Sequence, residues 1–296
     1  MEKITVFTPA YNRAYSINLC YESLCRQTCK DFIWMVIDDG STDNTAQLIK
    51  EWQKLDNGFK IEYIYKKNGG MHSAHNTAYD NIKTELNVCI DSDDYMTDNA
   101  IEEILKCWED NKSEKYAGIL ALDIFTNNEI IGVELPRDKT DITLSGFYAN
   151  GGRGDKKLIY RTDIINKYPR YPEFEGERYV GLSYIYHLID QDYTLVILNE
   201  PVCVVEYRTD GSGYNMFRQY LNNPKGFAFY RKETMKLTEG FASNFKCAVH
   251  YVSSCIIGKE RHFIKQSPKK GITVLAVPFG AALTVYIRTM VKLKKM

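Results

Sequence analysis

The first 125 residues alternate between short apolar runs and longer stretches with helical spacing. Runs rich in Ile, Val, Phe and Tyr, bounded by turn residues, predict strands over 3–8, 32–37, 59–66, 86–90 and 117–125. Between these runs apolar residues recur every three or four positions, which predicts helices over 15–27, 44–55, 73–83 and 98–111. Strands that alternate with helices in this way predict an α/β fold with a doubly wound, mostly parallel sheet.

The alternation weakens after residue 125. Strand-like runs recur, but they are separated by irregular segments and by a glycine-bearing stretch over 146–154. We predict strands over 130–135, 157–161, 194–198 and 202–207, a helix over 178–190, and further helices over 214–258. The sequence therefore predicts a regular first half, a less regular second half that shares a core with the first, and C-terminal helices.

Polar loops follow four of the predicted strands. In doubly wound sheets, ligands bind beyond the carboxyl ends of the strands, so loops at these positions are expected to meet in one site. The loops are Thr8–Arg13, Asp38–Asp43, Lys66–Gly70 and Asp91–Asp94.

The loop Asp-Ser-Asp-Asp at 91–94 follows a buried strand and places three carboxylates together. Like charges at this spacing raise one another's pKa unless a cation lies among them. Mg²⁺ or Mn²⁺, held by one or two carboxylates and by diphosphate oxygens, is the natural partner. The alternative is a simple strand-to-helix turn in which Thr97 or Asp98 caps the next helix.

The loop Asp-Asp-Gly-Ser-Thr-Asp at 38–43 also has two interpretations. One aspartate can accept a hydrogen bond from a base N–H or a ribose hydroxyl, and Gly40 lets the backbone approach a ligand. Alternatively, Ser41, Thr42 or Asp43 caps the following helix. Helix capping leaves Asp39, at the tip of the strand, unexplained.

Taken together, these motifs resemble those of family 2 glycosyltransferases with the GT-A fold. Such chains typically read T-P-x-Y-N after the first strand, then D-D-G-S-x-D, then N-x-G, and then D-S-D-D. The absence of a Q-x-x-R-W string makes the resemblance one to enzymes that add one sugar per encounter rather than to processive synthases. The matching residues are Thr8–Asn12, Asp38–Thr45, Asn68–Gly70 with Ala74 and Asn76, and Asp91–Asp94.

The resemblance implies a role for each matched residue. It implies that Asp93 ligates Mn²⁺ or Mg²⁺ and that Asp91, with Ser92 beside it, reaches the metal or the ribose. The Tyr11 ring can stack on a flat base, and burial of this tyrosine in the core is the alternative. The residues that the resemblance places around the nucleotide are Thr8, Pro9, Tyr11, Asn12, Arg13, Asp39, Asn68 and Gly69.

Two further expectations concern the second half. An inverting transfer needs a base for the acceptor hydroxyl, and in the family an acidic residue at the start of a helix fills this role. Glu177 matches that place best and Glu175 is second, while a Glu that only favours the helix dipole is the alternative. Arg208, in a late polar loop, is expected to offset the charge of the diphosphate.

Charge is unevenly distributed along the chain. The formal net charge is +0, with 38 acidic and 38 basic residues, yet no acidic residue follows Glu260. A mildly acidic body does not fit a nucleic-acid binder, whose positive charge would cover a folded face. The uncharged run 272–287, followed by Arg288 and lysines, predicts a membrane-surface anchor interrupted at Pro278 and Gly280. A buried C-terminal helix or a homodimer contact is the alternative.

The cysteines and the N-terminus favour the cytoplasm. None of the eight cysteines forms a C-x-x-C pair, and the first residues run into a strand without the apolar stretch of a signal peptide. We therefore expect a cytoplasmic protein, peripheral at the inner face of the cell membrane.

The expected function is an inverting, metal-dependent transfer from a nucleotide-diphosphate sugar to a saccharide or lipid-linked saccharide in cell-surface polysaccharide synthesis. UDP is the expected nucleotide. The rival is a non-catalytic member of the same fold that binds nucleotide or lipid as a partner protein. We expect a nucleotide-sugar-binding half over 1–125 and an acceptor-side half of the same catalytic domain over 126–213. A helical extension over 214–264 and a membrane-associating tail over 265–296 are expected to follow.

Overall fold

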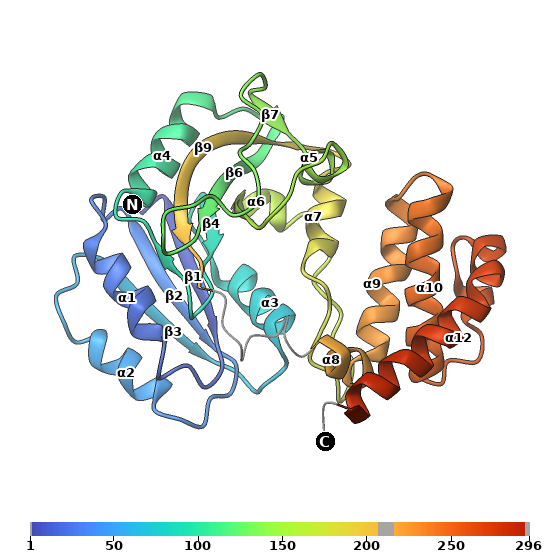
Figure 1. The fold of residues 1–296 in the computed structure, drawn as a ribbon. Helices are drawn as coiled ribbons and strands as arrows, with labels where there is room; N and C mark the ends of the chain where they lie inside the picture. Colours follow the sequence, from blue (N-terminus) through green and yellow to red (C-terminus); the bar gives the residue numbers. More distant parts are fainter. Residues whose placement is uncertain (1, 207–215, 294–296) are drawn as a thin grey trace. The chain divides into compact units, whose positions relative to one another are not determined.

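The computed structural model describes residues 2–206 and 216–293 (Figure 1). These residues form two compact units that do not follow chain order. The first unit comprises the chain up to Asn68, Ala74–Pro169 and Leu188–Glu206. The second comprises Gly69–Ser73, Arg170–His187 and the helices after residue 206. The four-part division made from the sequence stays a prediction.

A single sheet organises the first unit, and its first strands lie where the sequence predicts them. Strand β1 pairs in parallel with β2 and β4, and β2 pairs in parallel with β3. The order of the described strands is β3-β2-β1-β4-β8-β6-β9-β5, with β7 beside β9. Their bounds are β1 Ile4–Ala10, β2 Phe32–Asp38, β3 Lys60–Tyr65, β4 Leu86–Cys89, β5 Tyr95–Met96, β6 Tyr116–Ile124, β7 Asp141–Ile142, β8 Lys156–Arg161 and β9 Thr194–Val204.

Helices pack on both faces of this sheet. Because successive side chains of a strand point to opposite faces, Val6 joins the cluster that contains residues of α1, α2 and α4. Phe7 contacts the other layer, where its ring meets His75 of α3 edge to face at 5.0 Å. The helix bounds are α1 Ile17–Arg26, α2 Thr45–Trp52, α3 Met71–Asn81 and α4 Ala100–Asn111. The predicted doubly wound arrangement is confirmed for these elements.

The second half of the sheet differs in detail from the prediction. Strand β8 runs antiparallel between β4 and β6, while β9 is parallel to β6. The runs predicted at 194–198 and 202–207 form one strand, β9, with register shifts against β6 that absorb the extra residues. The strand predicted at 130–135 is wrong. Only Ile130 makes a bridge, and Gly132 turns the chain with a φ of 80°.

Short helices complete this part of the chain. They are α5 Leu144–Ala149 and α6 Thr162–Ile165 in the first unit, and α7 Ser183–Ile189 at the division between the units. The helix predicted from residue 178 therefore begins at Ser183, and residues 178–182 are not helical.

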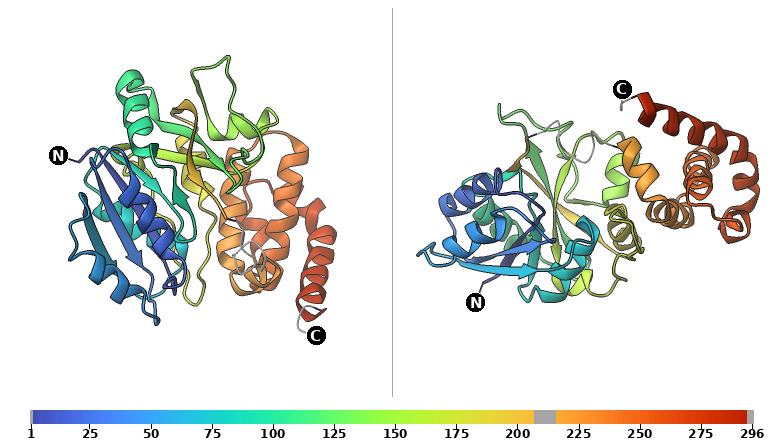
Figure 2. Two further views of the ribbon diagram at one scale, coloured as in Figure 1. Left: turned by 60° about the vertical axis from the view of Figure 1, so that its left-hand side comes forward. Right: turned by 90° about the horizontal axis from the view of Figure 1, so that it is seen from below.

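The remaining helices lie in the second unit, where α9, α10 and α12 pack side by side (Figure 2). Gly280 of α12 makes this packing close, since a Cβ there would lie 2.5 Å from Cγ1 of Val252. The Ser253 and Thr284 hydroxyls lie 3.0 Å apart in the same contact. The bounds are α8 Met216–Asn222, α9 Pro224–Leu237, α10 Phe241–Ile257, α11 Phe263–Gln266 and α12 Lys270–Leu293.

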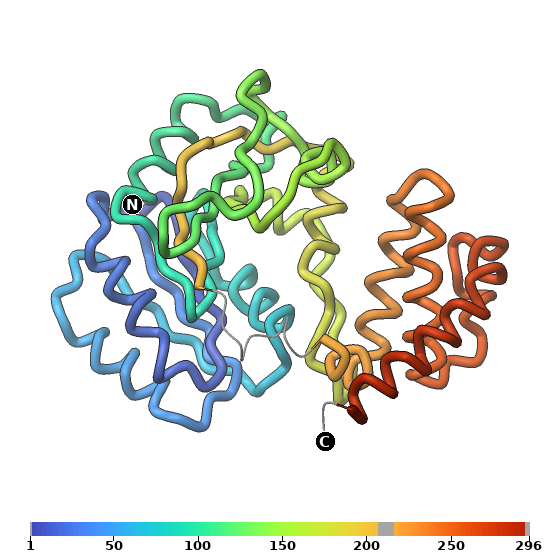
Figure 3. The backbone as a smooth tube through the Cα atoms, viewed as in Figure 1, coloured from blue at the N-terminus to red at the C-terminus, as the bar shows by residue number. Residues whose placement is uncertain are grey.

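The predicted interruption of the tail at Pro278 and Gly280 is wrong. Helix α12 runs through both residues and is 24 residues long. Figure 3 traces it without a break. Pro278 lies on the exposed face, where the carbonyl that loses its N–H partner can be hydrated, and Gly280 serves packing instead. At 1.5 Å per residue the helix is about 36 Å long.

One face of α12 is apolar and exposed. Its large exposed apolar residues include Val274, Leu275, Phe279, Val285 and Tyr286, which we call the outer face of α12. By length and composition α12 is the one described helix that could cross a membrane, a test that the core helices of soluble proteins also pass. The opposite face packs on α10, as described above.

Candidate functional site

The first two strand-end loops are joined by hydrogen bonds. Asn12, with a φ of 53°, donates its backbone N–H to Ser41 Oγ at 2.9 Å and accepts the Thr42 N–H through Oδ1 at 2.7 Å. The Arg13 N–H donates to Thr45 Oγ1 at 2.9 Å. The loop after β1 therefore rests on the loop after β2.

The two aspartates that follow β2 have different surroundings. Asp38 is fully buried, and it accepts hydrogen bonds from the Tyr63 hydroxyl at 2.6 Å and from the Ser41 N–H at 2.7 Å. Burial and the hydrogen bond to Asp38 raise the pKa of Tyr63. Asp39 instead pairs through Oδ1 with Lys66 Nζ at 2.7 Å. Asp38 thus has a structural role, while Asp39 is held at the strand end by a cation.

The third loop packs against the second. A Cβ on Gly40, whose φ is 84°, would lie 2.8 Å from the backbone nitrogen of Asn68. The Asn68 Oδ1 atom is buried and accepts no hydrogen bond from the part of the chain that the structure describes. A buried amide oxygen without a donor is unusual in a folded protein and marks a place for a ligand or a water.

The fourth loop alternates between half-buried and buried residues. Asp91 and Asp93 are half-buried, whereas Ser92 and Asp94 are buried. The Arg13 Nε donates to Ser92 Oγ at 3.2 Å, which links this loop to the first one. Asp94 accepts the Glu206 N–H at 3.3 Å, and burial raises its pKa to about 7, opposed by the charge of Lys157.

A second ion pair, between a largely buried lysine and a buried aspartate, joins β8 and β6. The Lys157 ammonium of β8 is 3.8 Å from Asp123 Oδ1 of β6. Burial raises the pKa of Asp123 to about 6, and Lys157 is the largest influence in the other direction. Lys66 and Lys157 were missed by the sequence analysis. Lys66 could have been found from its place in a strand-end loop, whereas Lys157 lies inside a strand whose spacing carries no such signal.

The candidate nucleotide contacts of the first loop divide by exposure. Thr8 and Pro9 are buried, and Thr8 Oγ1 accepts a hydrogen bond from Trp34 Nε1 at 3.0 Å, so these side chains support the loop from below. Tyr11 is 44% exposed, which excludes its burial in the core and leaves its ring accessible. Gly69 follows Asn68 in the chain and falls in the second unit.

The candidate bases lie in the second unit, and the predicted place of Glu177 is corrected. Glu177 precedes α7 by six residues, so it does not begin that helix. Its carboxylate instead accepts the backbone N–H groups of Lys225 at 3.0 Å and Gly226 at 2.8 Å, in the first turn of α9. Glu175 is exposed. Arg208 lies outside the described residues.

The sequence was compared with models of known protein families. The model described as glycosyl transferase family 2 matches residues 5–168, which is more than half of the 296 residues. The chain belongs to glycosyl transferase family 2. The matched region contains all four strand-end loops.

Individual relatives match a shorter part of the chain. A glycosyltransferase named GlyA from Streptococcus pneumoniae serotype 4 is 34% identical over 105 residues, which is 36% of this chain and 15% of the relative. The chondroitin synthase of Pasteurella multocida is 37% identical over 103 residues, 35% of this chain and 10% of the relative. The chain thus matches less than a fifth of the length of these two relatives.

Solved structures share the fold over nearly the whole chain. The complex of S. aureus TarS 1–349 with UDP-GlcNAc aligns with a TM-score of 0.61 and 17% identity, and it covers 93% of this chain and 79% of that one. The mannosyltransferase PcManGT of Pyrobaculum calidifontis, in complex with GDP-Man and Mn²⁺, aligns with a TM-score of 0.57 and 17% identity, covering 95% and 73%. This family 2 chain therefore has the GT-A fold.

The carboxylates of the fourth loop fit a hard divalent cation. Two half-buried carboxylates, Asp91 and Asp93, together with phosphate oxygens of a donor, form a donor set that Mg²⁺ or Mn²⁺ accepts. Within residues 2–206 and 216–293 no group of three or more His, Cys, Asp or Glu side chains could hold a metal ion. A cation bound here would thus depend on the donor for much of its coordination.

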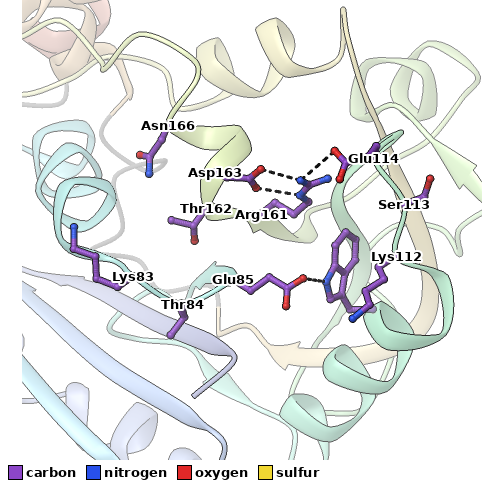
Figure 4. A pocket seen from close by; sticks show the side chains of 11 residues that line it. Lys83, Thr84, Glu85, Lys112, Ser113, Glu114, Arg161, Thr162, Asp163 and Asn166 are labelled. Atoms are coloured by element: carbon purple, nitrogen blue, oxygen red, sulfur yellow. Dashed lines mark hydrogen bonds and ion pairs between the residues drawn. The ribbon is translucent and has the colours of Figure 1, made fainter. Parts of the chain in front are cut away.

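A cavity of about 640 Å³ lies in the first unit, away from the strand-end loops (Figure 4). Its lining includes Glu85, which precedes β4, Glu114, which precedes β6, and Arg161, which ends the antiparallel β8. These positions mark the amino ends of the parallel strands. Arg161 forms ion pairs with Asp163 and Glu114, so its charge is already balanced. The cavity is separate from the family 2 site.

Proposed function

We propose that this chain is an inverting glycosyltransferase that uses a nucleotide-diphosphate sugar, with UDP as the nucleotide. The observation that carries the proposal is the assembly of the loops after β1, β2, β3 and β4 at one sheet edge through Asn12, Arg13 and Gly40. The GT-A neighbours in complex with UDP-GlcNAc and GDP-Man support a nucleotide sugar as the donor.

In the proposed complex the nucleotide lies on the first three loops. Tyr11 offers an exposed ring for stacking on the base, and Asp39 and Asn68 Oδ1 offer acceptors for its N–H groups or for ribose hydroxyls. Asn12 and Arg13 hold the first loop on the second and so lie beside the proposed nucleotide. Thr8 and Pro9 support this surface from within the sheet.

The diphosphate is proposed to lie over the fourth loop. Asp93 and Asp91 would hold Mn²⁺ or Mg²⁺, and the bound cation would screen the charge that develops on the departing diphosphate. Arg13 reaches this loop through Ser92, and the Arg13 guanidinium adds positive charge there. Arg208 is proposed to offset the same charge from the late loop.

We assign the base to Glu175 and a structural role to Glu177. The reaction forms a bond between the acceptor oxygen and the anomeric carbon, breaks the bond to the diphosphate oxygen, and transfers the acceptor proton to a carboxylate. Both carboxylate oxygens of Glu177 already accept backbone N–H groups at the start of α9, so this side chain is held in a cap. Glu175 is exposed to an incoming acceptor.

The acceptor is proposed to be a saccharide or lipid-linked saccharide in cell-surface polysaccharide synthesis, and the relative named chondroitin synthase supports a polysaccharide as the product. The outer face of α12, with Lys270, Arg288 and Lys292 at its ends, suits an anionic lipid surface at the inner side of the cell membrane. A homodimer that buries the same face is the alternative arrangement.

A donor-panel binding experiment tests this proposal against a non-catalytic role. UDP-, GDP-, CDP- and ADP-linked sugars are added to the whole chain with and without Mn²⁺, and the melting temperature is recorded. We expect a UDP-sugar to raise the melting temperature, and to raise it further with Mn²⁺. A chain that binds nucleotide identically in both conditions and releases no nucleoside diphosphate would be the non-catalytic partner protein.

A further inference from the structure

Three basic side chains gather on the helical hairpin formed by α9 and α10 in the second unit. Arg231 lies on α9, while Lys246 and His250 lie one turn apart on α10, which packs against α9. Burial lowers the pKa of His250 to about 4, and the positive charges of Arg231 and Lys246 act in the same direction. The three groups, which we call the basic site, are therefore close in space.

The basic site has no counter-charge. Arg231 and Lys246 form no ion pair with another residue that the structure describes. The Arg231 Nε is buried and donates no hydrogen bond within the same residues. Glu233, the acid nearest to Arg231 along α9, pairs with Lys236 instead. Because partly buried cations without an acid and a buried N–H without an acceptor are both unfavourable, this combination marks a place for an anion.

The other titratable groups around the basic site are phenols. The ring of Tyr220, on α8, lies 6.0 Å from the ring of His250. The Arg231 Cζ lies 5.2 Å from the centre of the Tyr230 ring, and Arg231 also acts on Tyr179, whose pKa is raised by burial. A phenol can donate its hydroxyl hydrogen and is uncharged near pH 7. Cations surrounded by hydroxyl donors suit the oxygens of a phosphate group.

Helix α8 links the basic site to the outer face of α12. The Phe217 ring of α8 meets the Tyr286 ring of that face at 5.7 Å, and Tyr220, one turn later on α8, contacts His250. Figure 1 shows α8 beside the C-terminal end of α12. A place for an anion thus lies close to an exposed apolar surface, which suits a ligand that combines a phosphate with hydrocarbon.

We propose that Arg231, Lys246 and His250 bind the phosphate headgroup of an anionic lipid whose hydrocarbon part contacts the outer face of α12. The proposal rests on the membrane association proposed above and adds a specific headgroup contact to it. The phosphate oxygens accept hydrogen bonds from the guanidinium and the ammonium group. Since the phosphate compensates these two charges, His250 becomes easier to protonate when the lipid is bound.

Binding of the whole chain to vesicles that differ in headgroup tests the proposal. Phosphatidylcholine vesicles carry either phosphatidic acid, which exposes its phosphate, or phosphatidylserine at the same surface charge. The wild type is expected to bind the phosphatidic acid vesicles at least about tenfold more tightly, because a charge-assisted hydrogen bond contributes about 1.5 to 3 kcal/mol. Arg231→Gln and Lys246→Met are each expected to remove this preference.

Lys232→Met is the matched control, because it removes the same charge from the next position of α9. The charge of Lys232 acts on Cys255 rather than on His250. This variant is expected to keep the preference for phosphatidic acid and to weaken both kinds of binding less than about fivefold, the effect of one surface charge. Arg231→Gln is expected to melt at or above the wild-type temperature, because Arg231 has no counter-ion whose loss would destabilise the fold.

The pKa of His250 provides a second readout at the site itself. Its ring signals, assigned by their absence in His250→Gln, are titrated by NMR without ligand, with short-chain phosphatidic acid and with inorganic phosphate. Short-chain phosphatidic acid is expected to raise the pKa by at least about one unit, which corresponds to about tenfold tighter binding by the protonated chain. Inorganic phosphate, which lacks the hydrocarbon part, is expected to have a smaller effect at equal concentration.

Several results would overturn the inference. They are a wild type without preference between the two vesicles, equal losses in Arg231→Gln and Lys232→Met, and a His250 pKa that phosphatidic acid leaves unchanged. An equal effect of inorganic phosphate would overturn the assignment to a lipid. A wild type that prefers phosphatidic acid but releases no UDP from a UDP-sugar would instead refute the proposed transferase function and leave the basic site standing.

Discussion

Glu177 provides the sharpest stability prediction because its carboxylate caps a helix that is distant in sequence. Helix α9 begins with Pro224, which has no N–H, so the first available donors are those of Lys225 and Gly226, and Glu177 accepts both. The adjacent Asn223 makes no side-chain cap and instead accepts the Arg178 N–H at 2.7 Å. Replacing Glu177 therefore leaves the N-terminus of α9 without its anion.

The magnitude follows from these two bonds. A hydrogen bond to a charged group contributes about 1.5 to 3 kcal/mol, and Glu177 is partly exposed, so the lower end applies. Glu177→Ala loses both bonds and should lower the free energy of unfolding by about 2 to 4 kcal/mol. Glu177→Gln keeps one acceptor oxygen but turns its NH₂ toward the other backbone N–H, so it should cost about 1 to 2 kcal/mol.

Urea unfolding and activity, measured together, separate the capping role from catalysis. Glu175→Ala and Glu175→Gln are the matched controls, because Glu175 lies two residues away and is exposed. Glu175→Gln should unfold like the wild type yet lose about two to four decades of transfer rate. If Glu177→Ala unfolds like the wild type, the capping argument fails. If Glu177→Gln instead shows the kinetic loss, the base is Glu177.

The remaining predictions address burial and the tail. Burial, with the nearby charges of Arg231 and Lys246, lowers the pKa of His250 to about 4. The unfolded chain therefore takes up a proton on His250 at a higher pH than the folded chain does. Acidification from pH 7 to 5 should reduce the free energy of unfolding by about 1 to 2 kcal/mol more in wild type than in His250→Gln, as urea unfolding of both proteins would show. Lys157→Met leaves the buried Asp123 without its cation and should lower the free energy of unfolding by about 3 to 5 kcal/mol. Adding Asp123→Asn should recover much of this loss. A double variant as unstable as Lys157→Met would show that the ion pair is not the cause. Leu275→Glu on the outer face of α12 should abolish sedimentation with anionic vesicles at an unchanged melting temperature, because Leu275 is 58% exposed. Retained binding would remove the membrane assignment.

The sequence predicts the regular half of the fold well because local and long-range signals agree there. Strands β1 and β2 are almost entirely buried on both faces, as strands covered on both sides must be, and each is followed by a polar loop. The contacts of Asn12 with Ser41 and of Arg13 with Ser92 follow from this topology, since parallel strands deliver their carboxyl ends to one edge. Position at a strand end, more than any single motif, predicts that these loops meet.

The sequence-based predictions fail where contacts between distant segments determine the local structure. Glu177 caps α9 from 47 residues before Pro224, and local helix-start signals cannot report such a partner. The tail was expected to break at Pro278, yet packing of its other face on α10 keeps the helix continuous. The Lys66–Asp39 pair likewise depends on the register between β2 and β3, which pairs Asp38 with Tyr65. No periodicity or residue spacing in the sequence indicates any of these contacts.

Release of nucleoside diphosphate from a UDP-sugar is the measurement that tests the central claim most directly. The whole chain and its Asp93→Asn variant are incubated with a panel of UDP-sugars and Mn²⁺, with and without chelator, and the UDP formed is quantified. We expect the wild type to release UDP and this release to stop on chelation. Asp93→Asn should still unfold cooperatively but release UDP at least about a hundredfold more slowly. Full, metal-independent release by Asp93→Asn would contradict it.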